Sequence, residues 1–376
     1  MSVSKLPNVG TTIFTTMSAL AHEHGAINLA QGFPNFPIDP LLQEQLLKVA
    51  RESVHQYAPL QGLPTLREKI CNLVTKQYGR SIGGQEVLIT AGATQAIFTA
   101  IQALVFPGEE VIILDPSYDC YEAPVLLAGA KAIRIPLTDS FEPNWSLIEA
   151  KTTQKTKLLI INNPHNPSGK VWSSADFDAL EGIMSRFPNL LLLSDEVYEF
   201  IAFEKGHQSI HERNTIRDRA LIVSSFGKTF HITGWKVGYV VCSDFLMKEL
   251  LKVHQFLVFS VNSVAQAALA NYLDLVDVNE LSKFYQDKRD FFRQGLKNSR
   301  FELWPAEGSY FQVANIRGIS GLSDIEFCRE LTIKHGVAAI PISVFNADVK
   351  DQGLIRFCYA KTTETLQDAI EKLCKI

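Results

Sequence analysis

Two lysines stand among glycines in one short segment, residues 225–238, and their spacing suits Schiff-base chemistry. Lys228 follows a glycine just after the apolar, strand-like run 220–223, and Lys236 comes a few residues later. A lysine amine can condense with an aldehyde and act as a covalent catalyst. The hydroxyl of Ser225 and the charge of Lys236 can bind a phosphate group. The segment therefore indicates that Lys228 carries a phosphorylated aldehyde, pyridoxal 5′-phosphate (PLP).

The tripeptide Gly227-Lys228-Thr229 also resembles the end of a nucleotide-binding P-loop. That motif needs a glycine five residues before its second glycine, and the residue at this position is Ile222. The sequence therefore excludes a P-loop. A Gly-Lys-Thr tripeptide alone is most often a solvated turn, so the interpretation depends on the other motifs of the chain.

Polar residues follow the ends of five predicted strands. Short apolar strands alternate with helical segments between residues 87 and 224, a pattern typical of an α/β domain with a mostly parallel sheet. Ligands bind such sheets outside the carboxyl ends of the strands. The polar sets are Ala93 and Thr94, Tyr118, Asn162 and Asn166, Asp195 and Tyr198, and Ser225 and Lys228. We therefore expect these side chains to meet at one edge of the sheet.

The PLP ring can be held by four of these residues. A carboxylate that faces the pyridine nitrogen keeps it protonated, which makes the ring an electron sink, and Asp195 is the candidate. An isolated aspartate more often caps a helix or pairs with an arginine. Asn166 and Tyr198 can donate to the phenolic oxygen, and Tyr118 can stack on the ring face.

The phosphate and the amine have their own candidates. The turn before the helix that opens at Ala93 and Thr94 points free N–H groups and a positive dipole end at an anion. Ser225 and Lys236 add a hydroxyl and a charge. Lys228, once released by the amino acid, would move the proton between the substrate α-carbon and the cofactor.

Arg356 stands between apolar residues in the strand-like segment 354–359. A guanidinium in such surroundings needs an anionic partner, and it binds a carboxylate by two parallel hydrogen bonds. We expect Arg356 to hold the α-carboxylate of an amino acid; a structural salt bridge is the alternative. The Gly32 N–H, in the loop 31–37, is either part of a plain turn or open to close approach by a ligand.

Length and composition set the class of protein. The chain has 376 residues, 46% hydrophobic and 20% charged, with a net charge of −4. These values suit a globular protein of about two or three domains and do not favour a nucleic acid as partner. No apolar run approaches the roughly 18 residues of a membrane span, and residues 1–7 lack the apolar core of a signal peptide. The six cysteines are scattered, so we expect reduced thiols and a cytoplasmic location.

The composition changes near residue 300, which indicates a second, smaller α+β domain. We expect an N-terminal segment that joins the small domain and dimer contacts (1–40), a large PLP-binding domain (41–270) and a small C-terminal domain (271–376). His207 and His211 lie four residues apart in a loop-like segment without cysteine or acidic ligand spacing, so no metal site is expected.

With these motifs taken together, the chain resembles the class I, fold-type-I PLP-dependent aminotransferases over nearly its whole length. It most resembles the branch with kynurenine and glutamine transaminases and bacterial methionine aminotransferases. The resemblance implies an α/β PLP-dependent transferase of fold type I, with a mostly parallel seven-stranded sheet in the large domain and a smaller α+β domain. The matching stretches are 27–34 (INLAQGFP), 56–62 (QYAPLQG), 90–95 (TAGATQ), 115–119 (DPSYD), 162–168 (NNPHNPS), 194–199 (SDEVYE), 225–238 and 354–357.

The resemblance assigns the family's roles to the same candidates. Lys228, Asp195 and Tyr198 match the catalytic group, and the α-carboxylate clamp matches Arg356, Asn166 and the Gly32 N–H. The cofactor-binding residues match Ala93, Thr94, Tyr118, Asn166, Asp195, Tyr198, Ser225, Lys228 and Lys236. Tyr57 matches a tyrosine that reaches the phosphate of the neighbouring subunit, which implies a homodimer with shared active sites. Phe14, Tyr57 and Phe259 match the side-chain pocket, with Phe259 supplied by the partner.

Three departures bear on the substrate. Lys236 stands where aspartate aminotransferases have arginine, and Ser260 replaces the histidine of kynurenine-type enzymes. No second arginine is a candidate for binding a side-chain carboxylate. We therefore expect a neutral or aromatic amino donor, with methionine favoured and phenylalanine, tyrosine, glutamine and kynurenine also accepted.

The function expected is a ping-pong aminotransferase, which converts an amino acid to a 2-oxo acid and then runs the reverse reaction on a second oxo acid. A cysteine-S-conjugate β-lyase, which would use the same residues to eliminate a leaving group, is the alternative among enzymes. A non-catalytic amino-acid sensor with an aminotransferase-like domain is a remote alternative, because the resemblance starts almost at the first residue and leaves no room for a DNA-binding segment.

Overall fold

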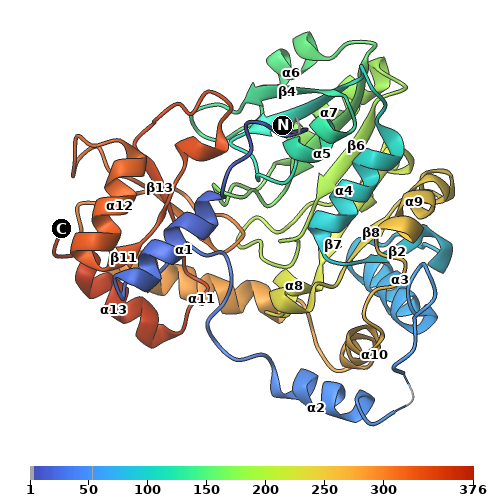
Figure 1. The fold of residues 1–376 in the computed structure, drawn as a ribbon, viewed down its shortest axis with the longest axis horizontal. Helices are drawn as coiled ribbons and strands as arrows, with labels where there is room; N and C mark the ends of the chain where they lie inside the picture. Colours follow the sequence, from blue (N-terminus) through green and yellow to red (C-terminus); the bar gives the residue numbers. More distant parts are fainter. Residues whose placement is uncertain (1–3, 53) are drawn as a thin grey trace.

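The computed structural model describes residues 4–52 and 54–376. A larger α/β body and a smaller α+β body lie side by side in it (Figure 1). The larger body is built on a sheet with the strand order β2-β8-β7-β6-β5-β3-β4. Its strands are β2 (Val87–Thr90), β3 (Glu110–Asp115), β4 (Lys131–Pro136), β5 (Thr156–Asn162), β6 (Leu191–Asp195), β7 (Ala220–Ser225) and β8 (Gly238–Val241).

This sheet confirms the expected mostly parallel seven-stranded architecture. β3, β4, β5, β6 and β7 pair in parallel, while β8 runs antiparallel between β2 and β7. β2 therefore has the same direction as β7, and the carboxyl ends of β2, β3, β5, β6 and β7 share one edge. The strands are almost continuous runs of valine, isoleucine and leucine because both faces of the sheet are covered.

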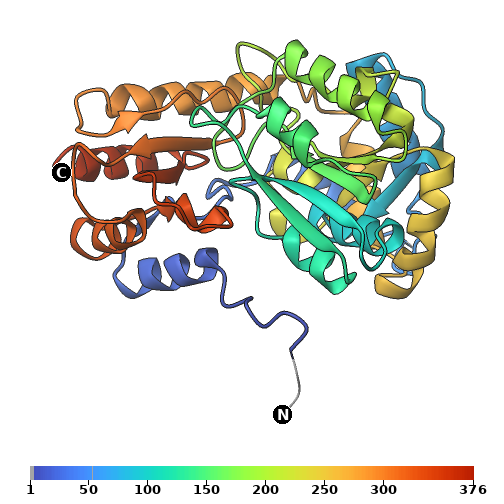
Figure 2. The same cartoon turned by 90° about the horizontal axis from the view of Figure 1, so that it is seen from above.

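Helices cover both faces of the sheet (Figure 2). Along β5, Leu158 and Ile160 pack in the cluster that contains α4, while Leu159 and Ile161 pack on the other face with α7. This alternation is the period of two expected of a strand. The helices of this body are α2 (Pro40–Val49), α3 (Pro64–Tyr78), α4 (Ala93–Leu104), α5 (Glu122–Leu127), α6 (Trp145–Lys151), α7 (Ser174–Arg186), α8 (Phe226–Thr229), α9 (Asp244–Leu257) and α10 (Ser263–Tyr272).

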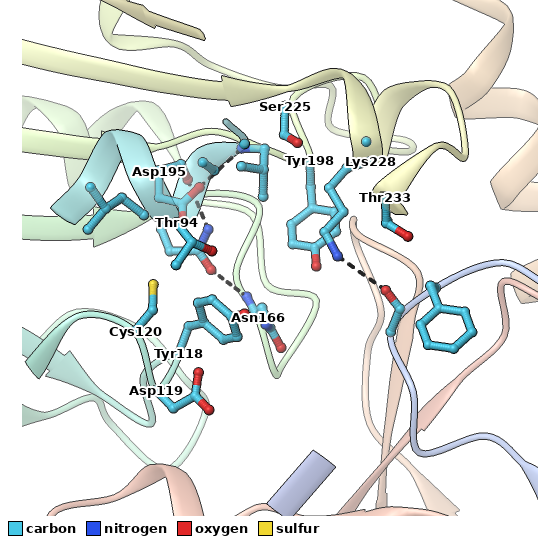
Figure 3. Close-up of a pocket in the computed structure, with 18 of the residues that line it drawn as sticks. Thr94, Tyr118, Asp119, Cys120, Asn166, Asp195, Tyr198, Ser225, Lys228 and Thr233 are labelled. Carbon is cyan, nitrogen blue, oxygen red and sulfur yellow. Dashed lines mark hydrogen bonds between the residues drawn. The ribbon is translucent and has the colours of Figure 1, made fainter. Parts of the chain in front are cut away.

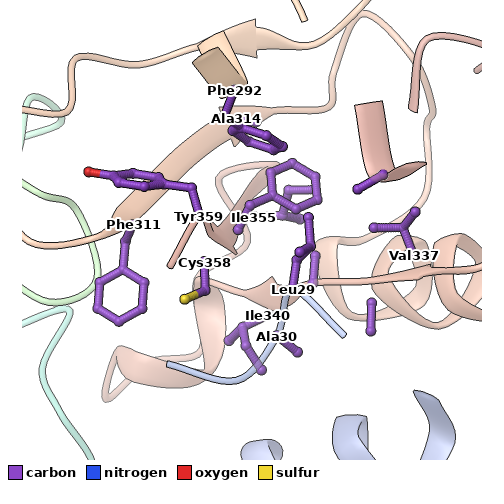
Figure 4. Close-up of a cluster of buried hydrophobic side chains, with 14 of the residues drawn as sticks. Leu29, Ala30, Phe292, Phe311, Ala314, Val337, Ile340, Ile355, Cys358 and Tyr359 are labelled. Carbon is purple, nitrogen blue, oxygen red and sulfur yellow. The ribbon is translucent and has the colours of Figure 1, made fainter. Parts of the chain in front are cut away.

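The smaller body combines the end of the chain with its beginning. A four-stranded antiparallel sheet has the order β12-β13-β10-β9, and β1 pairs in parallel with β11. Figure 4 shows its core, where Leu29 and Ala30 lie beside Ile340 and Ile355. Its elements are α1 (Ile13–Glu23), β1 (Ile27–Asn28), α11 (Glu280–Gly295), β9 (Glu302–Leu303), β10 (Phe311–Asn315), α12 (Asp324–His335), β11 (Val337–Ala338), β12 (Ile340–Pro341), β13 (Leu354–Cys358) and α13 (Thr363–Leu373).

The pairing of β1 with β11 anchors the N-terminal segment in the smaller body. We accordingly propose the division into segments 1–40, 41–270 and 271–376; residues 1–3 of the first segment lie outside the described residues. Within the described part of the chain, no helix is long and apolar enough to cross a membrane.

Candidate active site

A cavity of about 480 Å³ opens at the shared carboxyl edge of the strands, between the two bodies. Figure 3 shows the residues that converge on it from the ends of β3, β5, β6 and β7 and from the start of α4. The predicted site residues that line the cavity are Phe14, Gly32, Ala93, Thr94, Tyr118, Asn166, Asp195, Tyr198, Ser225, Lys228, Lys236 and Arg356. The structure therefore brings together segments from both ends of the chain.

Lys228 reaches into this cavity from α8, which follows β7 directly. Its Nζ donates a hydrogen bond to the Gly32 carbonyl at 3.2 Å, drawn as a dashed line in Figure 3. It also lies 5.8 Å from the ring centre of Tyr198 and 5.7 Å from that of Tyr310. Burial lowers the pKa of the Lys228 amine to about 8. The uncharged fraction of the amine near neutral pH is therefore larger than for an ordinary lysine, as nucleophilic and general-base chemistry requires.

Asp195 is buried at the end of β6. Burial raises the pKa of its carboxyl group to about 6, against the effect of two donors and of the Lys228 charge. The donors are the Tyr121 hydroxyl, 2.6 Å from Oδ2, and the Val197 N–H, 3.3 Å from Oδ1. Sequence reasoning missed Tyr121, although it lies three residues after Tyr118 in the same turn. The carboxylate is held in place and lacks a cationic partner of its own at ion-pair distance within the described residues.

An anion site forms where α4 begins. Gly92 precedes the helix with a φ of +80°, and the first-turn N–H groups from Ala93 onward have no partners inside the helix. Lys236 Nζ lies 3.2 Å from the point where a Cβ on Gly92 would be. A Cβ on Gly238 would lie 2.8 Å from the Ser224 carbonyl oxygen, so only glycine lets β8 pass this close to the α4 N-terminus. A charge and a helix dipole therefore point at one spot.

Arg356 is fully buried on β13. Its Nη1 donates to Asn166 Oδ1 at 2.8 Å and its Nη2 donates to the Ala30 carbonyl at 2.9 Å. Nε is buried without a hydrogen-bond partner, and the guanidinium carbon lies 3.9 Å from the Phe311 ring centre. No carboxylate of the described residues lies within ion-pair distance of this arginine. The structure thus contradicts the salt-bridge alternative, and the buried guanidinium lines the cavity.

Two hydrogen-bond donors that sequence reasoning missed hold the loop that carries Gly32 in place. The Tyr310 hydroxyl donates to the Gly32 carbonyl at 2.7 Å, and Lys361 Nζ donates to the Phe33 carbonyl at 2.7 Å. A Cβ on Gly32 would lie 3.0 Å from the Phe311 ring. A larger residue at position 32 would therefore require the Phe311 ring or the loop to shift by a few tenths of an ångström.

Phe14 completes the wall of the cavity from α1. Its ring centre lies 5.4 Å from the Arg356 guanidinium carbon and 6.3 Å from the Tyr118 ring centre. A side chain attached next to a carboxylate on Arg356 would therefore contact aromatic surface.

Tyr57 and Phe259 do not line the cavity of the single chain. Their rings pack against each other with centres 5.3 Å apart, and they are 81% and 53% exposed. The single chain therefore does not place these two predicted site residues at the cavity. His207 and His211 take part in a buried polar network instead: Glu196 lies 2.9 Å from His207 Nε2, and Arg80 lies 3.3 Å from His211 Nδ1.

Comparison with known proteins gives consistent matches. The family model for aminotransferase class I and II matches residues 24–373. The chain is 47% identical to the methionine aminotransferase of Escherichia coli (strain K12), over 98% of this chain and 97% of that protein. It is 30% identical to a kynurenine–oxoglutarate transaminase of Dictyostelium discoideum, over 98% of this chain and 94% of the relative. The crystal structure of YbdL from Escherichia coli, described with a methionine aminotransferase function, is similar with a TM-score of 0.97 and 46% identity over the whole of both chains.

Proposed function

This chain belongs to the class I and II aminotransferases, and we propose that it uses PLP to move the amino group of a neutral or aromatic L-amino acid to a 2-oxo acid. The match confirms the resemblance and the transaminase activity expected from the motifs. Methionine is the amino donor we favour, because the chain is 47% identical to a methionine aminotransferase. Phenylalanine, tyrosine, glutamine and kynurenine are further candidates.

The residues of the cavity fit PLP, the cofactor on which this family depends in general. The α4 N-terminus, Lys236 and Ser225 form a corner suited to a phosphate dianion. Asp195 offers an anion, held by hydrogen bonds, for a protonated ring nitrogen. Tyr118 gives a flat surface, and Lys228 gives an amine whose pKa is lowered to about 8. The donors thus match a phosphate, a ring cation and an aldehyde within one cavity.

When bound, PLP supplies an aldehyde that condenses with amines and a ring that withdraws electrons from the attached carbon. Arg356 and Asn166 bind the substrate α-carboxylate, which places the α-carbon near the Lys228 amine. Lys228 Nζ would accept the α-proton of the substrate and give it back, because its lowered pKa suits both directions near neutral pH. The Asp195 carboxylate holds a proton on the ring nitrogen throughout. A second oxo acid then uses the same groups in reverse.

The observation that carries this proposal is the half-buried Lys228 amine, which shares a cavity with an Arg356 guanidinium that has no ion-pair partner among the described residues. Borohydride reduction of the yellow protein, followed by peptide mapping, should label Lys228 alone. A donor screen with a fixed acceptor should then rank methionine above aspartate and glutamate in kcat/KM. Label on another lysine, or a preference for aspartate, would contradict the proposal.

We also propose a cytoplasmic homodimer in which each chain supplies Tyr57 and Phe259 to its partner's cavity. The exposure of both rings supports this arrangement. A mixed dimer of Lys228→Ala and Tyr57→Ala chains contains one site with both native residues. Mixing the two variants after dissociation should therefore recover up to about a quarter of the wild-type activity, as random pairing with one native site per mixed dimer gives. Activity no higher than the sum of the separate variants would contradict shared sites.

A further inference from the structure

One charged side chain that lines the cavity has no role in the proposed function. The charged residues of the lining are Asp119, Asp195, Lys228, Lys236 and Arg356. The last four account for the ring nitrogen, the amine, the phosphate and the α-carboxylate. Asp119 remains: it follows Tyr118, whose ring lies 6.3 Å from that of Phe14, the cavity residue that the resemblance assigns to the substrate side-chain pocket.

The position of Asp119 sets what it can touch. It follows Tyr118 directly, and Figure 3 shows its carboxylate beyond the Tyr118 ring, on the side away from Asp195. Asp119 is an exposed residue of the lining, and partial desolvation by the surrounding protein raises the pKa of its carboxyl group, while its own backbone N–H and the positive charge of Arg356 lower it. The carboxylate therefore lies within electrostatic reach of the group that holds the substrate. The Phe14 ring lies 6.3 Å from the Tyr118 ring and 5.4 Å from the Arg356 guanidinium carbon, so aromatic surface lies beside both groups.

Asp119 does not serve the fold in an obvious way. Among the described residues, its carboxylate forms no ion pair within 4.0 Å, and Tyr121, not Asp119, is the N-cap of α5. The neighbouring Asp115, by contrast, is buried and paired with Arg134. A carboxylate that lines a cavity and has no ion-pair partner among the described residues is available to a ligand.

We propose that Asp119 selects the substrate side chain: it accepts a hydrogen bond from an N–H donor, as in a side-chain amide, and repels a second carboxylate. The inference rests on the proposed function and names the substrate class of the same site. It makes neutral donors that end in an amide better substrates than their acidic isosteres. Methionine, which has no N–H donor and no charge on its side chain, is insensitive to Asp119.

L-Glutamine, L-glutamate and L-methionine test the proposal, because they have similar length and differ in the group at the end. In the wild-type enzyme, kcat/KM for glutamine should exceed that for glutamate by at least about tenfold, since like charges brought together cost affinity. Asp119→Asn should reduce this ratio about tenfold, through a gain for glutamate and a loss for glutamine. Its kcat/KM for methionine should stay within about twofold of wild type.

Asp368→Asn on α13 is the matched control, because it removes the same charge at an exposed position away from the cavity; it should leave the ratio unchanged. An unchanged ratio in Asp119→Asn, or equal losses for all three substrates with a weaker dimer, would overturn the inference. A wild-type enzyme that uses glutamate as well as glutamine would overturn it without any variant. If methionine is transaminated in each of these cases, the proposed function still stands; if no substrate is converted and no PLP spectrum forms, the proposed function itself fails.

Discussion

The two walls of the cavity are built in different ways. The wall that faces the cofactor comes from consecutive strand ends of one sheet, so each functional side chain lies within a few residues of a strand. The opposite wall joins remote segments: Arg356 contacts Asn166 across 190 positions and Ala30 across 326 positions. Lys228 reaches the Gly32 carbonyl across 196 positions.

The difference indicates that one wall carries the catalytic groups and the other wall selects the substrate. This end of the sheet is rigid, because β3, β5, β6, β7 and β8 are each held by two neighbouring strands, and it suits groups whose geometry must not change. The opposite wall depends on the packing of α1, the Gly32 loop and β13, so small changes there can alter which side chains fit. We therefore expect substitutions of Lys228, Lys236 and Asp195 in the cofactor wall to affect all substrates equally, and substitutions in the substrate wall or at Asp119 to change affinity or ranking.

The largest effect should come from Lys228→Ala in the cofactor wall. Loss of the nucleophile and proton carrier should lower kcat for every donor by at least about 1000-fold. Stopped-flow absorbance and steady-state assays would measure it. Lys236→Ala is the informative comparison. This variant should bind the PLP phosphate more weakly, and excess PLP should restore most of its activity. A kcat of Lys228→Ala equal to that of the wild type would contradict the assignment of the catalytic amine to the cofactor wall.

Arg356→Lys should have the next largest effect, on the substrate wall. A lysine cannot replace the paired donors of a guanidinium, so kcat/KM should fall about 100-fold for amino acids and oxo acids alike. The affinity for PLP and the borohydride labelling of Lys228 should be unchanged. A large loss of PLP affinity in this variant would show that the two walls are not separable.

Tyr121→Phe tests the support of the cofactor wall. Burial raises the pKa of Asp195 to about 6, and the Tyr121 hydrogen bond opposes the rise. Without this hydrogen bond the pKa of Asp195 should rise further. The carboxylate is an anion only above its pKa, so as the pH is lowered the variant should lose PLP affinity at a higher pH than the wild type does. We expect about tenfold weaker binding at neutral pH, as for a lost hydrogen bond to a charged group.

Fluorescence titration with PLP on both sides of the Asp195 pKa would measure this effect. Tyr272→Phe is the matched control, because the Tyr272 hydroxyl donates to Asp39, away from the cavity. The same pH profile in Tyr121→Phe and wild type would show that Tyr121 does not support Asp195.

Phe14→Leu should have the smallest effect and only on ranking. The ring lies against Arg356 and Tyr118, so its loss should lower kcat/KM for phenylalanine about fivefold, as for an aromatic contact, and for methionine less. Phe106→Leu, at an exposed position, is the control. Equal losses for both donors would place Phe14 in binding rather than selection.

Much of the large body could be predicted from sequence, because strands buried on both faces leave nearly continuous apolar runs with a polar residue at each end. Asp195, Lys228 and Tyr118 were found in this way. The support of these residues could not be predicted. The hydrogen bond of Tyr121 to Asp195 and that of Tyr310 to the Gly32 carbonyl depend on packing between segments far apart in the chain.

The sequence by itself determined the kind of chemistry: a lysine after a strand, a carboxylate after another, and an arginine between apolar residues. The tertiary structure decided the pKa of the lysine and whether the arginine has an ion-pair partner. Burial lowers the pKa of the Lys228 amine to about 8, and Arg356 is left without a carboxylate partner among the described residues. Both results depend on which remote segments exclude water from these side chains and which charged groups those segments place next to them. Neither can be deduced from the residues adjacent in sequence.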